Sequence, residues 1–186
     1  MNEPELAQKN YREAIRIQKE LKDEKGLATI YFNLAYLFID VQQWPQAYQY
    51  LKEADNISRK TDLGWMTIIN RATLAATCTK INKIAEAQAL LKEIQQLLPK
   101  AIYDLERVYF YHAQGALAYF FKNYAQSLQY HQKAFSYAKD WKDPYFIADE
   151  LMAIGEAYHQ LNNADSTLKY YKEALKVAEK KTTCPK

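Results

Sequence analysis

The chain contains 186 residues, of which 49% are hydrophobic and 25% are charged, a balance typical of a soluble globular protein. Four glycines and five prolines are too few for a turn-rich β architecture, so helices are favoured. The formal net charge of +3 is too small to indicate nucleic-acid binding, and the longest apolar stretch, around 28–39, is too short to cross a membrane.

The cysteines and the first residues bear on where the protein acts. Neither Cys78 nor Cys184 has a partner at the spacing of a disulfide framework or a metal site, which favours a reducing compartment. The opening segment, 1–5, is acidic and polar, unlike a signal peptide. We therefore expect a cytoplasmic protein.

Similar side chains recur every 40 residues along the chain. One column of this pattern is Tyr11, Leu51, Leu91, His131 and Tyr171. Apolar or small residues also recur four positions before it and three positions after it, which is the spacing of one face of a helix. A second column, on a preceding helix, is Ala35, Ala75, Gly115 and Gly155. Small residues at such positions let two helix backbones approach closely.

In chain order, the pattern predicts nine helices in an all-α chain. An unpaired helix covers 1–22; it is the second half of a repeat, either because the chain is cut from a longer protein or because a half-repeat caps the array. The remaining segments are helix pairs at 27–60, 65–98, 101–139 and 144–180, then a tail at 183–186. Gly26 and Gly64 are expected in connections, and Asp143 with Pro144 should begin the last pair. We expect 1–182 to form a single solenoid.

The pattern resembles the tetratricopeptide repeat, whose signature is W-x2-L-G-x2-Y followed by A-x3-F and a proline. In the last repeat the matching positions are Leu151, Ile154, Gly155, Tyr158, Thr167 and Tyr171. The family repeat has about 34 residues, whereas this one has 40. It is therefore similar to long-repeat members such as kinesin light chain, the Leu-Gly-Asn repeat adaptors, and peptide-sensing or MalT-like bacterial regulators.

The resemblance implies a right-handed α-solenoid whose concave groove is lined by the first helix of each pair. The residues expected to face this groove are Phe32, Asn33, Tyr36, Asp40, Thr73, Lys80, Tyr109, His112, Tyr119, Glu156 and His159. A groove with small residues between aromatic and polar walls can accept bulky side chains of a peptide. Asn33 matches an Asn that holds peptide backbone in the resembled peptide receptors; the alternative is that it bridges neighbouring repeats.

No pattern in the sequence indicates catalysis. Glycine-rich phosphate loops are absent. The three histidines, His112, His131 and His159, are far apart in the sequence, and none pairs with a Cys or a carboxylate at metal spacing. His131 occupies a packing column, which favours a core histidine. We therefore predict no enzymatic activity, no cofactor and no metal ligand.

Three functions remain open. The first is a non-catalytic scaffold that holds a protein segment or short peptide in the concave groove. The second is a peptide-sensing regulatory domain of a bacterial transcriptional or signalling regulator. The third is a structural module that self-associates through the end helices, near 4–22 and 164–180, because the ends of a solenoid leave apolar surface uncovered.

Overall fold

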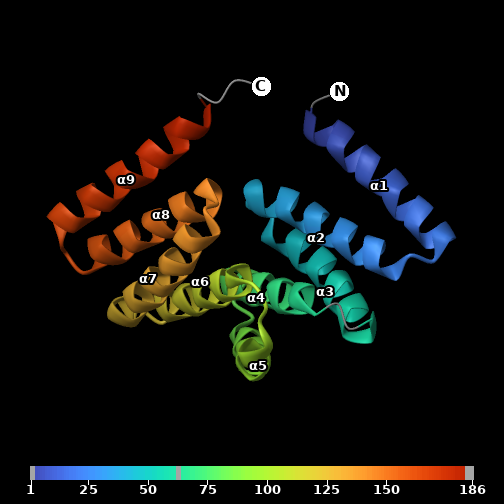
Figure 1. Ribbon diagram of the computed structural model, residues 1–186, viewed down its shortest axis with the longest axis horizontal. Coiled ribbons are helices and arrows are strands. Elements are labelled where there is room, and N and C mark those ends of the chain that lie inside the picture. Colours follow the sequence, from blue (N-terminus) through green and yellow to red (C-terminus); the bar gives the residue numbers. More distant parts are fainter. Residues whose placement is uncertain (1–2, 62–63, 183–186) are drawn as a thin grey trace.

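The computed structural model describes the backbone of residues 3–61 and 64–182 and the side chains of 10–61 and 64–179 (Figure 1). This part of the chain is all-α and without strands, as predicted. Its helices are α1 (Glu3–Leu21), α2 (Glu24–Asp40), α3 (Trp44–Thr61), α4 (Trp65–Lys80), α5 (Ile84–Leu97), the 3-10 helix η1 (Leu98–Lys100), α6 (Asp104–Phe120), α7 (Tyr124–Trp141), α8 (Pro144–Gln160) and α9 (Ala164–Thr182). The predicted tail at 183–186, with Cys184, lies outside the described residues.

Consecutive helices pack as hairpins, α2 with α3, α4 with α5, α6 with α7, and α8 with α9. The hairpins are stacked into an arc, with α1 and α9 at its two ends (Figure 1). Neighbouring hairpins meet through α3 on α4 and through α7 on α8, and α1 covers α2 in the same way. In the middle of the arc α4 packs directly against α6, and α5 projects from the outer side.

The turn inside each hairpin is the same structure repeated every 40 residues. Its left-handed residues are Gln42, Asn82, Lys122 and Asn162, with φ between 56° and 61°. The next residue donates its N–H to the carbonyl five positions earlier, as in Asn123 to Ala118 at 3.0 Å. This Schellman arrangement satisfies carbonyls that the helix end leaves free, and it reverses the chain within three residues.

The small residues of the second column lie where paired helices cross. A Cβ atom added to Gly115 would lie 2.5 Å from the His131 ring, and one added to Gly155 would lie 2.5 Å from the Tyr171 ring. In the first two repeats the equivalent residues are alanines, and the second helices carry leucines instead of rings, as in Ala35 and Leu51. The small residue is therefore smaller where its partner across the hairpin is larger.

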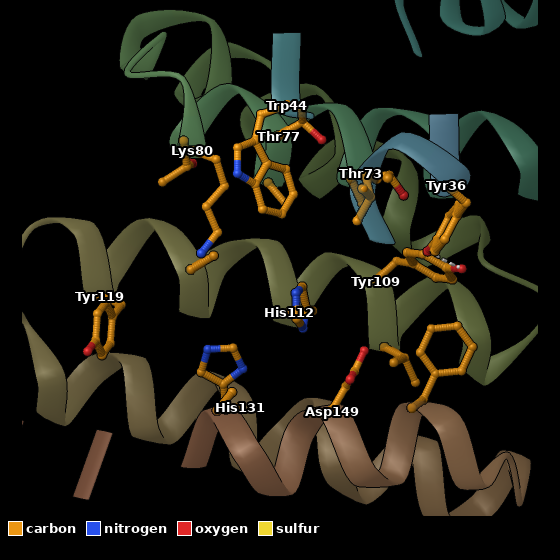
Figure 2. A pocket seen from close by; sticks show the side chains of 18 of the residues that line it. Tyr36, Trp44, Thr73, Thr77, Lys80, Tyr109, His112, Tyr119, His131 and Asp149 are labelled. Carbon is orange, nitrogen blue, oxygen red and sulfur yellow. Dashed lines mark hydrogen bonds between the residues drawn. The ribbon is translucent and has the colours of Figure 1, made fainter. Parts of the chain in front are cut away.

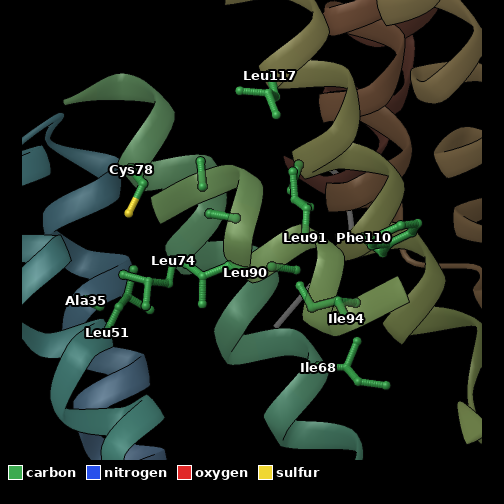
Figure 3. Close-up of a cluster of buried hydrophobic side chains, with 14 residues drawn as sticks. Ala35, Leu51, Ile68, Leu74, Cys78, Leu90, Leu91, Ile94, Phe110 and Leu117 are labelled. Atoms are coloured by element: carbon green, nitrogen blue, oxygen red, sulfur yellow. The ribbon is translucent and has the colours of Figure 1, made fainter. Parts of the chain in front are cut away.

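The centre of the hydrophobic core surrounds α4, which is enclosed by α3, α5 and α6. Leu51, Leu74 and Ile94 are fully buried there, together with the free thiol of Cys78 (Figure 3). The core thus runs continuously from one hairpin to the next rather than being confined within each pair.

Two predicted helix starts differ from the structure. Gly26 lies inside the first turn of α2 rather than in a connection, because the Asp23 side chain caps the helix by accepting the Gly26 N–H at 3.0 Å. The third pair begins with α6 at Asp104 and not at 101. Its first turn is fixed by the buried Glu106 carboxylate, which accepts N–H groups from Ile102 and Tyr103.

Asp143 and Pro144 begin α8 as predicted, and the Asp143 side chain accepts the Tyr145 N–H at 2.8 Å. None of the helices in the described part combines the length and the apolar character that crossing a bilayer requires.

Candidate functional site

A cavity of about 380 Å³ lies on the concave side of the arc, among the first helices of the four hairpins (Figure 2). Side chains from α2 and α4 face those from α6 and α8 across it. Its small residues are Ala72, Ala76, Ala116 and Ala153, and its aromatic residues are Tyr36, Trp44, Tyr109, Tyr119, Phe120, Tyr145 and Phe146. The cavity is therefore a preformed, mainly apolar site with a limited set of polar groups, the usual composition of a ligand pocket.

Part of the predicted groove lines this cavity. The residues that do so are Tyr36, Thr73, Lys80, Tyr109, His112 and Tyr119. The predicted residues outside its lining are Phe32, Asn33, Asp40, Glu156 and His159. Asn33 is exposed and forms no hydrogen bond with any described residue. Phe32 packs instead against the ring of Tyr36, with ring centroids 5.0 Å apart.

One end of the cavity is formed by phenol groups. The Tyr36 hydroxyl donates a hydrogen bond to the Tyr109 hydroxyl, with an O···O distance of 2.7 Å. Burial raises the pKa of Tyr36 well above its usual range and raises the pKa of Tyr109 to about 12. Burial, with nearby Asp149 and Asp40, also raises the pKa of Tyr145 to about 12. These phenols are therefore protonated at neutral pH. Tyr36 already donates its proton to Tyr109, and Tyr145 donates to Oδ1 of Asp40 at 3.5 Å. Among these three residues, the Tyr109 hydroxyl can therefore donate a hydrogen bond to a ligand.

Asp149 adds a carboxylate to this end of the cavity. Burial raises the pKa of its side chain; nearby His112 opposes this effect, and the neighbouring carboxylates of Glu150 and Asp40 reinforce it. No Lys or Arg among the described residues lies within ion-pair distance of Asp149. The cavity therefore holds a negative charge that has no permanent cationic partner.

Farther along α6, the opposite end of the cavity carries a positive charge. The Lys80 ammonium lies over the Trp44 ring, 5.7 Å from its centroid, in cation–π geometry. Tyr119 adds a second aromatic ring at this end (Figure 2), and the next residue, Phe120, also lines the cavity. Trp44 was not predicted, because it begins the second helix of its hairpin and only the first helices were expected to line the groove.

Between the two ends, His112 and His131 lie against Glu150. Nδ1 of His112 is 2.6 Å from Oε1 of Glu150, and Nδ1 of His131 is 2.7 Å from Oε2. Burial alone would raise the pKa of Glu150, but the two histidines outweigh it and lower that pKa to about 2. For His112, burial lowers the pKa, and the Glu150 charge more than compensates, so the pKa is raised.

The expectation that the histidines stay apart from carboxylates was therefore wrong. His131 is a buried helix-seam residue, as its column indicated, but the seam also brings it to Glu150 and beside His112. Glu150 belongs to a column that reads Ile30, Asn70, Phe110, Glu150, and its last three members are all buried. A carboxylate in a column that also holds Ile30 and Phe110 was the signal in the sequence that Glu150 faces inward, but it did not identify the histidines as its partners.

No protein-family model matches the chain, and no curated protein sequence matches it. Solved structures match its fold. A Rap protein complexed with competence and sporulation factor has a TM-score of 0.77 and 17% identity, covering 91% of this chain and 47% of the Rap chain. A signal-transduction ATPase of the STAND type with a tetratricopeptide repeat sensor, from Pyrococcus horikoshii, has a TM-score of 0.71 and 20% identity, covering 92% of this chain and 26% of that one.

Putative kinesin light chain repeats from Podosopora anserina match 97% of this chain and cover 95% of their own, with a TM-score of 0.57 and 13% identity. The predicted resemblance is thus confirmed at the level of architecture: the chain has the fold of tetratricopeptide-like helical repeat proteins. It spans less than half of the Rap chain and about a quarter of the STAND chain.

Proposed function

We propose that this protein is a non-catalytic scaffold that binds a short peptide or an extended protein segment in its concave cavity. The observation that carries this proposal is the cavity itself, about 380 Å³ in volume and walled by aromatic rings from several helices. That volume lies within the range of ligand pockets and exceeds what an imperfection of core packing would leave.

The distribution of polar groups supports a peptide over a wholly apolar ligand. Asp149 lies near the phenol groups at one end of the cavity, and Lys80 lies at the other. The protonated Tyr109 hydroxyl can donate a hydrogen bond to a backbone carbonyl, and the alanines of the cavity leave room for side chains. A Rap protein with this architecture has been solved with competence and sporulation factor, which supports the same kind of occupant here.

A regulatory role is compatible with the same site. The STAND protein of this fold carries its repeats as a sensor. In that case peptide binding would change the arrangement of the hairpins and so control an attached module. We take the cytoplasm as the location, because Cys78 is a buried free thiol.

Self-association is a second candidate, favoured by the two end helices. Leu21 in α1 is 69% exposed and Leu175 in α9 is 58% exposed. Apolar side chains at both ends of a solenoid could stack chain on chain. Light scattering over a range of concentrations tests this candidate, and a constant monomer mass would exclude it.

The binding proposal is tested by selecting peptides from a random display library on the immobilised protein and measuring their affinity by fluorescence anisotropy. Two adjacent residues provide a matched pair, since Phe120 lines the cavity and Phe121 does not. Phe120→Ala should weaken binding about tenfold or more, as expected for an aromatic contact residue. Phe121→Ala should leave the affinity unchanged. Equal effects of the two substitutions would place the binding surface elsewhere.

A further inference from the structure

The cluster of His112, His131 and Glu150 joins three different helices at the wall of the cavity. His112 comes from α6, His131 from α7 and Glu150 from α8, and one potential ligand atom of each lies within 4.8 Å of the others. Two imidazole nitrogens and one carboxylate oxygen form a ligand set that Zn²⁺ and related divalent transition metals bind in proteins.

Packing fixes the orientation of this set. The absence of a Cβ at Gly115 lets the Nε2 edge of the His131 ring sit against the α6 backbone, where a Cβ would be only 2.5 Å from Nε2. The opposite edge of the ring therefore presents Nδ1 to Glu150. His131 and Glu150 are 4% and 0% exposed, so neither side chain can readily adopt another rotamer. Preorganised donor atoms lower the entropic cost of binding an ion.

The charge balance of the cluster also favours a cation. Glu150 is fully buried, and no Lys or Arg among the described residues pairs with it. Its partners are two imidazoles, which carry a charge only when protonated. Burying a carboxylate without a permanent positive charge is costly. A bound divalent ion would supply that charge.

Access to the site is available from the cavity. Both histidines line the cavity, and the side chain of His112 is 40% exposed. Ligand atoms about 2.0–2.1 Å from a tetrahedral ion lie roughly 3.3 Å apart. The present N···O distances of 2.6 and 2.7 Å must therefore lengthen by roughly 0.6 Å as the ion takes the place of the Nδ1 protons. Each bound imidazole then carries its proton on Nε2, and any surplus proton passes to solvent. His112, at the cavity wall, has the room to make most of this movement.

We propose that His112, His131 and Glu150 form a binding site for one divalent transition-metal ion, with Zn²⁺ the best-fitting ion, and that its open coordination position faces the cavity. Metal binding at this site does not require the proposed peptide binding, since all three ligands belong to the chain itself, although the site opens into the same cavity. Under this proposal the cluster binds a metal ion as well as holding neighbouring hairpins together.

The test is isothermal titration of ZnCl₂ into the full chain after removal of metal by EDTA and dialysis. One ion per chain should bind. His112→Gln and Glu150→Gln should each weaken binding about 100-fold or more, because removing a group that only hydrogen-bonds to a metal ligand already costs about 10–100-fold and these residues are the ligands themselves. His159→Gln is the matched control, because His159 is an exposed histidine on the same helix as Glu150 and lies outside the cluster. That variant should bind as tightly as the unaltered protein.

Cobalt substitution provides a second readout that needs no variant. Co²⁺ bound by these ligands should give visible absorption bands of a tetrahedral or five-coordinate site, saturating at one ion per chain. The proposal would be overturned by the absence of stoichiometric binding, or by affinities for Zn²⁺ that are the same in His112→Gln, Glu150→Gln and the His159→Gln control. Either result would leave the cluster as a hydrogen-bonded contact only.

Discussion

Replacing Gly155 with alanine would place a methyl carbon 2.5 Å from Cδ1 and Cε1 of the Tyr171 ring. Ordinary contacts begin near 3.4 Å, so the ring or α9 must move by about 1 Å. Overpacking of this kind costs about 1–3 kcal/mol. The added methyl group also favours the helix by about 1 kcal/mol. The net loss in free energy of unfolding should therefore be about 0–2 kcal/mol.

The two contributions can be separated by changing Tyr171 as well. The first two repeats carry alanine opposite leucine at these positions, so Gly155→Ala should be accepted in a Tyr171→Leu background. There the substitution should raise the free energy of unfolding by about 1 kcal/mol, which is the helix preference alone. The coupling energy between the two positions should then be about 1–3 kcal/mol.

Urea denaturation of the original protein, both single variants and the double variant measures this coupling energy. Additive effects, within about 0.5 kcal/mol, would show that Gly155 and Tyr171 do not constrain each other. The account of the small-residue column would then be wrong.

Three further predictions concern individual residues. Lys122→Gly should raise the free energy of unfolding by about 1 kcal/mol in urea, because Lys122 has a left-handed φ of 59°, and a decrease would contradict this. Burial raises the pKa of Cys78 to about 12, so in a Cys184→Ser background a thiol reagent at pH 8 should label Cys78 only at the unfolding rate; rapid labelling of the native protein would refute this. In the metal-free protein, the stabilising contribution of Glu150 should be lost as pH falls below its usual 4.5 towards about 2, and that of His112 as pH rises through a value above 6.5. The stability deficit of Glu150→Gln should therefore be greatest between these limits, and a deficit independent of pH would refute the assignment.

The architecture was predictable because its information is local and repeated. The 40-residue columns place one apolar face on every helix, and the hairpin turns recur at the same interval, as at Gln42 and Lys122. The predicted starts of α2 and α6 were wrong because a single side chain, rather than the repeat pattern, determines where each helix begins. Asp23 caps α2 before Gly26, and Glu106 reaches back to fix the first turn of α6. Such bonds depend on geometry that a column of residue types does not record.

The candidate site was predictable only in part, because it depends on how the hairpins curve. Tyr36 and Tyr109 were predicted to face the groove, and both line the cavity. The prediction did not include the hydrogen bond between them, which joins residues 73 positions apart in the sequence. Asn33 lies three residues before Tyr36, yet it is exposed and outside the cavity lining. The contact between His131 and Glu150 joins different columns of successive repeats, which self-similarity alone cannot reveal.

The central claim is that the concave cavity is the binding surface, and filling the cavity tests it most directly. Ala116 lines the cavity from the C-terminal half of α6, whereas Ala89 is exposed on α5 and lies outside it. The measurement is the dissociation constant of a library-selected peptide for Ala116→Trp, with Ala89→Trp as the control. We predict at least a 100-fold loss of affinity for Ala116→Trp alone, at unchanged helical content. Equal affinities for the two variants would contradict the claim.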